Sequence, residues 1–136
     1  MFLVFEIDPV PASRPRVPRF GRVYYAKPYS EFKDDMSKLV LAAPASLFDC
    51  PLSTEITFFK LIPVSLSNKK RNDMDGKLCI SNADLDNLEK AIYDALQGRV
   101  YVDDKQIVSH STKKVWVKER PRIEILINEL PYESAR

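Results

Sequence analysis

The sequence predicts a single α+β domain in which two helices pack on one face of a mixed, mostly antiparallel sheet. Short runs rich in β-branched and aromatic residues predict strands, and two longer segments carry apolar residues at helical spacing. The order of these segments along the chain fits helices packed against one sheet. A chain of 136 residues suits one hydrophobic core, so residues 1–136 are expected to form one domain.

The first half of the chain is expected to contain a strand, a long loop and a helix. Residues 2–7 (FLVFEI) predict the strand. Residues 8–28 hold several prolines and arginines, which favours an extended loop or a loose hairpin with a short strand in GRVYYAK (21–27). Residues 29–43 predict a helix, with Ser30 as its N-cap.

The second half is expected to contain a strand, a helix and three further strands. Residues 53–62 (STEITFFKLI) predict a strand, whereas residues 63–83 are polar and irregular, as functional loops often are. The next helix ends at Gly98, and its apolar stripe consists of Leu85, Leu88, Ala91, Ile92, Ala95 and Leu96. The last strands are expected over 100–102, 107–117 and 122–128.

Composition argues against several classes of protein. Hydrophobic residues make up 45% and charged residues 29% of the chain, which is typical of a soluble globular domain. The apolar run at the N-terminus is too short for a membrane span and lacks the basic start of a signal peptide. We therefore expect a cytoplasmic protein without a membrane partner. Cys50 and Cys79 lie in no CxxC or Cys/His pattern, which predicts free thiols rather than a zinc site.

Charge is distributed unevenly, although the net charge is only +2. The basic clusters are Arg14, Arg16, Arg19, Arg22 and Lys27, then Lys69, Lys70 and Arg71, and finally Lys113, Lys114, Lys118, Arg120 and Arg122. Acidic residues gather between Asp73 and Asp104. A protein with this charge distribution is expected to bind a polyanion through the basic clusters at its edges and a cation at its acidic centre. The alternative for each cluster is an ordinary solvated surface.

The acidic centre has the spacing of a metal site. In DLDNLEK (84–90), Asp84 and Asp86 point to the same side of an extended segment because side chains alternate with a period of two. Asp104 follows the helix and a short return strand, which can bring it back beside them. Ionised carboxylates that converge repel one another without a cation, and Mg²⁺ prefers carboxylate, water and phosphate oxygens. The pattern predicts Mg²⁺, with Mn²⁺ as a substitute, acting on a phosphodiester.

The same residues also have an ordinary structural interpretation. Asp86 or Asn87 can cap the helix, and Lys90 can pair with Asp86 one turn earlier. In the metal interpretation, Lys90 instead offsets charge on the transition state. His110, the only histidine, lies in a predicted strand and is expected to be a packed or edge residue rather than a general base.

Two longer motifs, DLDNLEKAIYDAL at 84–96 and GRVYVDDKQI at 98–107, are specific in combination. Three shorter segments accompany them in order: RPR at 14–16, NKKR at 68–71 and RPRIEILI at 120–127. On these residues the sequence resembles the RusA-type Holliday junction resolvases, small metal-dependent endonucleases often associated with phages. Many members have Lys-Pro or Arg-Arg just before the first motif, where this chain has Asn82-Ala83, so one phosphate contact is in doubt.

The resemblance implies roles for individual residues. Asp84, Asp86 and Asp104 would be the metal-binding and catalytic aspartates, and Lys90 the catalytic lysine. Asp104 is preferred to Asp103 because the family's essential acid matches the second Asp of the pair. The candidate supporting residues are Asp103, Asn87 and Gln106. The candidate DNA phosphate contacts are Arg14, Arg16, Lys69, Lys70 and Arg71.

The resemblance also implies a homodimer that acts on branched DNA. A four-way junction has near two-fold symmetry, and paired nicks need two active sites related by a similar axis. The expected function is Mg²⁺-dependent hydrolysis of phosphodiester bonds in four-way (Holliday) junctions during DNA recombination and repair. The alternatives are an accessory protein that binds branched DNA without cutting it, and a metal nuclease for flaps or forks. The intact aspartates argue against the accessory protein. The sequence does not distinguish a junction resolvase from a flap or fork nuclease.

Overall fold

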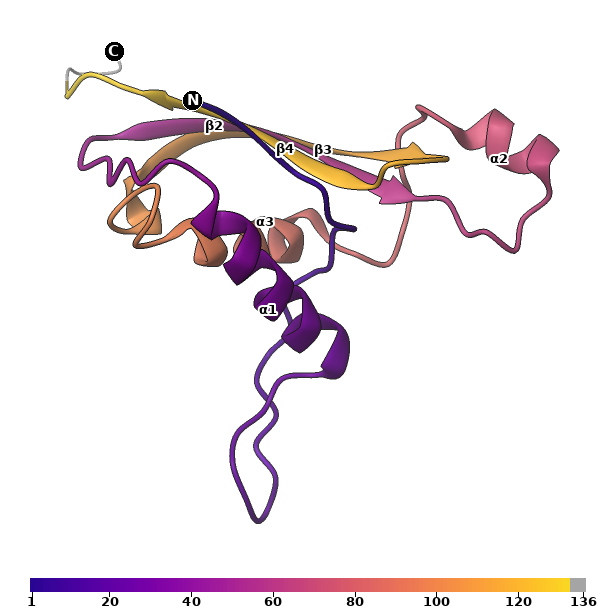
Figure 1. The fold of residues 1–136 in the computed structure, drawn as a ribbon, viewed down its shortest axis with the longest axis horizontal. Coiled ribbons are helices and arrows are strands. Elements are labelled where there is room, and N and C mark those ends of the chain that lie inside the picture. Colours follow the sequence, from indigo (N-terminus) through magenta and orange to yellow (C-terminus); the bar gives the residue numbers. More distant parts are fainter. Residues whose placement is uncertain (133–136) are drawn as a thin grey trace.

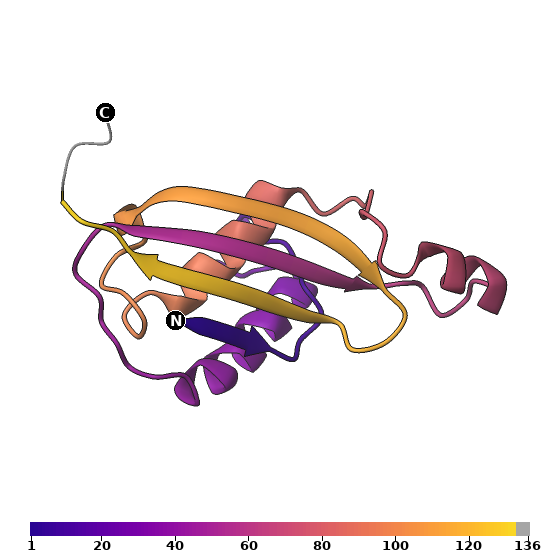
Figure 2. The ribbon, with the colours of Figure 1, turned by 90° about the horizontal axis from the view of Figure 1, so that it is seen from above.

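The computed structural model describes residues 1–132, and its sheet has four strands in the order β1-β4-β2-β3 (Figure 2). The strands are β1 (Phe2–Phe5), β2 (Leu52–Leu61), β3 (Ile107–Val117) and β4 (Arg122–Glu129). β4 pairs antiparallel with both β1 and β2, whereas β2 and β3 run parallel. The sheet is therefore mixed and mostly antiparallel, as predicted.

The two longer helices, α1 (Lys27–Leu41) and α3 (Leu85–Leu96), cover one face of this sheet (Figure 1). Side chains alternate between the faces of a strand, so Ile56 of β2 and Ile125 of β4 are buried toward the helices. Together with the helices, these strands enclose one core. The predicted α+β class with two helices on one face is confirmed.

Helix α3 is fixed on the sheet by its apolar stripe. Leu88 is 2% exposed, and Ile92 and Leu96 are fully buried, as their spacing predicted. The segment that follows is fixed by Tyr101, whose buried hydroxyl donates a hydrogen bond to the Tyr93 carbonyl (2.6 Å). This contact returns the chain along α3 and so determines where Asp104 lies.

Helix α1 begins at Lys27, earlier than predicted, and its N-cap position is Ala26. Ser30 lies inside the helix, so its predicted capping role is wrong. The misplaced start has a local cause in Pro28. A proline in the first turn loses no hydrogen bond, because the first N–H groups of a helix have no partner within it.

A third helix, α2 (Asn68–Met74), occupies part of the segment predicted to be irregular. It has no buried residue, so no apolar stripe marks it in the sequence. Its local signal is Ser67, whose hydroxyl accepts a hydrogen bond from the Lys70 N–H (3.3 Å). Both views of the ribbon place α2 beyond the end of the sheet and apart from α3 (Figures 1 and 2).

The strand predicted over 100–102 does not form. Tyr101 makes only isolated bridges, to Phe48 and Gln97. Gly98 turns the chain sharply with φ of 83°, and the short segment after it is used to pack Tyr101.

The loop between β1 and α1 projects from the domain as a loose hairpin, here named the arm (residues 13–26; Figure 1). One antiparallel bridge, between Arg16 and Tyr24, closes it. The expected loose hairpin is confirmed, whereas no regular strand forms in residues 21–27. Near its tip, Phe20 is 86% exposed.

Cys50 is half-buried and Cys79 is buried, and both are free thiols, as the sequence predicted. Of the helices within residues 1–132, none combines the length and the apolar character that crossing a membrane requires.

Candidate metal and DNA site

Asp84 and Asp86 lie at the start of α3 with exposed side chains. Asp84 occupies the N-cap position with extended backbone, but its side chain makes no capping hydrogen bond. Asp86 follows in the first helical turn, and neither carboxylate takes part in an ion pair within residues 1–132. The interpretation in which Asp86 or Asn87 caps the helix is therefore wrong. Capping does not explain the side chain of Asp84 either.

Lys90 pairs with Asp94 and leaves Asp86 without a cationic partner. Its Nζ lies 3.1 Å from Asp94 Oδ1, one turn further along α3. The hydrogen bond to Asp94 raises the pKa of Lys90, and the charge of Asp104 raises it further. Lys90 therefore keeps its positive charge at neutral pH and lies within the electrostatic reach of Asp104.

The two acids of the VDD segment have different environments. Asp103 caps the short 3₁₀ helix η1 (Asp104–Gln106), accepting a hydrogen bond from the Lys105 N–H (2.9 Å). Gln106 completes this capping box by accepting from the Asp103 N–H (2.8 Å), and its Nε2 donates to the Phe48 carbonyl (2.7 Å). Gln106, one of the candidate supporting residues, thus anchors η1 through both polar groups of its side-chain amide.

Asp104 lies beside α3, and among residues 1–132 its carboxylate has no hydrogen-bond or ion-pair partner. Its backbone N–H donates to Gln97 Oε1 (3.0 Å), which attaches η1 to the end of the helix. Since Asp103 is used in capping and Asp104 is not, the structure favours Asp104 as the acid available for a ligand.

The three aspartates do not form a closed ligand cluster. Within residues 1–132, no group of three or more His, Cys, Asp or Glu side chains is arranged to hold a metal ion. The donor chemistry nevertheless fits Mg²⁺ or Mn²⁺, because these free carboxylates are hard oxygen donors and Mg²⁺ usually keeps several waters and substrate oxygens.

A groove between the base of the arm and α3 brings Arg14 together with Lys90 and Asn87. The Ala12 N–H donates to the Asn87 carbonyl (2.8 Å) and so fastens the arm to the helix. Arg16 is also exposed but lies further along the arm. Of the two arginines, the structure therefore places only Arg14 in this groove.

The basic residues of α2 divide into free and anchored side chains. Lys69 and Lys70 are exposed. Arg71 is half-buried and donates from Nη2 to the Lys118 carbonyl (3.2 Å), which ties α2 to the end of β3. Because α2 lies apart from α3 (Figure 1), these lysines do not join the aspartates but extend the basic surface beyond them.

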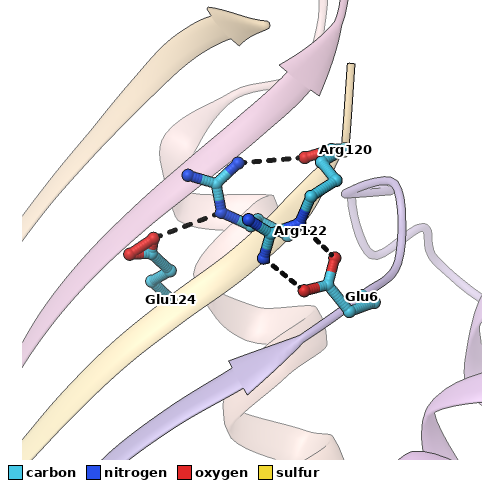
Figure 3. Close-up of polar contacts among 4 residues, drawn as sticks. All are labelled: Glu6, Arg120, Arg122 and Glu124. Carbon is cyan, nitrogen blue, oxygen red and sulfur yellow. Dashed lines mark hydrogen bonds and ion pairs between the residues drawn. The ribbon is translucent and has the colours of Figure 1, made fainter.

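Two arginines of the third basic cluster are already paired with acids (Figure 3). Arg120 binds the carboxylate of Glu6, and this hydrogen bond lowers the pKa of Glu6. Arg122 lies 3.3 Å from Glu124 and also stacks over the Phe59 ring. This part of the cluster is neutralised within the protein, so it is a poor candidate for binding DNA.

Sequence reasoning did not select Glu89, which the structure places in contact with His110. Glu89 is only 7% exposed, and its Oε2 lies 2.6 Å from His110 Nδ1. The sequence did carry a signal for this contact, because Glu89 directly follows Leu88 of the apolar stripe. An acid in that position is expected to be buried, and a buried carboxylate needs a partner. His110 is on the edge strand β3, the kind of position that the sequence predicted.

An arm that carries several arginines, beside a lysine that stays charged, is the kind of basic surface that indicates a nucleic-acid-binding domain. The sequence profile described as "Endodeoxyribonuclease RusA" matches residues 6–128. The chain belongs to this family, which confirms the resemblance and indicates endodeoxyribonuclease activity. The uncharacterized protein YqaN of Bacillus subtilis (strain 168) is 30% identical over 131 residues, which cover 90% of this chain and 92% of that protein.

Proposed function

We propose that the protein is a divalent-metal-dependent endodeoxyribonuclease that resolves four-way DNA junctions. The observation that carries this proposal is the contrast among the acids near α3. In the described part of the chain, the carboxylates of Asp84, Asp86 and Asp104 have no partner, whereas Asp103 is used in capping. Membership in the RusA family supplies the reaction class.

The proposed roles follow from the position and charge of each side chain. Asp84, Asp86 and Asp104 hold Mg²⁺ or Mn²⁺, an ion that can lower the pKa of a bound water and stabilise a leaving oxygen. Lys90, which stays protonated, faces the negative charge that develops on the phosphate. The proposed contacts to other phosphates are Arg14, Arg16, Lys69 and Lys70.

A homodimer belongs to this proposal. A junction offers two equivalent strands about a near two-fold axis, and two subunits would place one site at each of them. Paired nicks of this kind would serve DNA recombination and repair.

The testing experiment is cleavage of a synthetic mobile four-way junction in Mg²⁺ and in EDTA, beside a linear duplex and a flap of the same sequences. We expect paired symmetric nicks on the junction that EDTA removes. Cuts confined to the flap would instead support the flap or fork nuclease. Junction binding without cleavage in either Mg²⁺ or Mn²⁺ would favour the accessory protein.

Replacing Lys70 by alanine is expected to weaken junction binding without changing the cleavage pattern. The exposed side chain neutralises a phosphate, so its loss should make the salt dependence of log K shallower by about 0.9. Fluorescence anisotropy at several salt concentrations measures this slope. Lys38→Ala, at an exposed lysine of α1, is the matched control. Equal slopes for Lys70→Ala and the wild type would remove α2 from the DNA interface.

A further inference from the structure

The Glu89–His110 pair lies on a hollow that one proposed metal ligand, Asp104, also lines. This hollow is about 320 Å³ and is lined by Glu89 and Tyr93 of α3, Asp104 of η1 and His110 of β3. The His110 side chain is 55% exposed, whereas that of Glu89 is 9% exposed. A buried carboxylate thus holds an imidazole that remains accessible from the side shared with Asp104.

The pairing fixes the chemistry of the imidazole. An ionised carboxylate only accepts hydrogen bonds, so His110 Nδ1 carries the proton that lies between it and Glu89 Oε2 (2.6 Å). In the neutral ring, Nε2 is then left with a free lone pair. A base oriented by a buried carboxylate is the arrangement by which many hydrolytic sites activate a nucleophile.

Few other titratable groups face His110. Tyr93 stays neutral, because burial raises its pKa to about 12, and its hydroxyl is hydrogen-bonded to Thr54 Oγ1 (2.7 Å). Asp104, the remaining acid of the hollow, is half-buried. Among the described residues that line the hollow, the ring therefore has Glu89 as its close charged partner and Asp104 as a charged neighbour.

We propose that His110, oriented by Glu89, is the proton acceptor for the water that attacks the phosphodiester; this rests on the proposed function. One O–H bond of the water breaks and its proton passes to Nε2. The water oxygen forms a bond to phosphorus, and the bond from phosphorus to one bridging oxygen breaks. That oxygen leaves as an alkoxide and takes a proton from solvent, and His110 releases its own proton to solvent afterwards. Glu89 is a positioning residue, because it acts only through the ring.

The first test is His110→Gln in single-turnover cleavage of the junction. We expect the rate to fall about 10²-fold while the dissociation constant for the junction is unchanged. Ser111→Ala, at an exposed β3 residue whose strand partner is Glu55, is the control and should cleave like the wild type. A rate for His110→Gln equal to that of the wild type would overturn the inference.

The second test begins with the wild type and compares the titration of its imidazole with the pH dependence of cleavage. Because the chain has one histidine, NMR assigns its imidazole titration without ambiguity. We expect the midpoint to coincide with the acidic limb of kcat/KM, which reports groups of the free enzyme. Any change that Glu89→Gln causes in one midpoint should appear equally in the other, since both measurements would then report the same ring. Glu55→Gln, at an exposed glutamate of β2, should move neither.

The outcomes separate this inference from the proposed function. If the NMR midpoint and the kinetic limb differ, or if Glu89→Gln moves only one of them, His110 is not the proton acceptor. If Asp84→Asn abolishes cleavage and His110→Gln does not, only this inference fails. If cleavage survives both EDTA and Asp84→Asn, or if the wild type cuts no DNA, the proposed function fails and this inference with it.

Discussion

Asp84→Asn is expected to abolish junction cleavage and to leave junction binding intact or slightly tighter. Under the proposed function, the amide keeps the size of the side chain but removes a charged oxygen donor for the proposed metal and a repulsive charge near the proposed phosphate. Changing a residue that merely orients a ligand typically costs about 10–100-fold, so the loss of a ligand should exceed about 10²-fold. Single-turnover cleavage and anisotropy on the same junction measure both effects.

The control for this substitution is Asp35→Asn, at an exposed carboxylate of α1. It makes the same chemical change away from α3 and should alter neither cleavage nor binding. Turnover of Asp84→Asn equal to that of the wild type would contradict the metal assignment. A parallel loss of binding and of thermal stability would instead show that Asp84 holds the start of α3.

Ile92→Ala is expected to have the largest effect on stability. Ile92 is fully buried where α3 meets the sheet, so the substitution leaves a cavity beneath the helix that carries Asp86 and Lys90. The free energy of unfolding should fall by about 2–5 kcal/mol. The whole free energy of unfolding of such a domain is about 5–15 kcal/mol. Urea unfolding should show a lower midpoint with an unchanged m-value.

Ile80→Ala is a matched control because it deletes the same atoms from an isoleucine that is 95% exposed. Its effect should stay within about 0.5 kcal/mol. If the two alanine variants unfold at the same midpoint, Ile92 does not hold α3 on the sheet as described.

The places of the candidate site residues in the fold were predictable where they depended on local spacing. The DxD pair had to begin a helix, because an apolar stripe follows it directly, and Gly98 had to end that helix. The choice between Asp103 and Asp104 rested on the family resemblance alone. The structure adds a physical reason for that choice, because Asp103 caps η1 with Gln106 as its partner.

Features without a periodic pattern were not predictable. Helix α2 is exposed on all sides, so only Ser67 marks its start. The strand expected over 100–102 is short, and burial of Tyr101 decides its conformation instead. In both cases the local sequence carries too little information to outweigh packing.

By itself, the sequence determined the α+β class, the two core helices, most of the strands and the family. These follow from periodicity and motif spacing, which are properties of neighbouring residues. Only the tertiary structure decided which charges are free. Arg120 is paired with Glu6, and Glu89 is buried against His110. Over residues 1–132, Asp84, Asp86 and Asp104 are left without a partner. The reason is physical: the energy of a charge depends on its burial and on partners that are often distant in the chain.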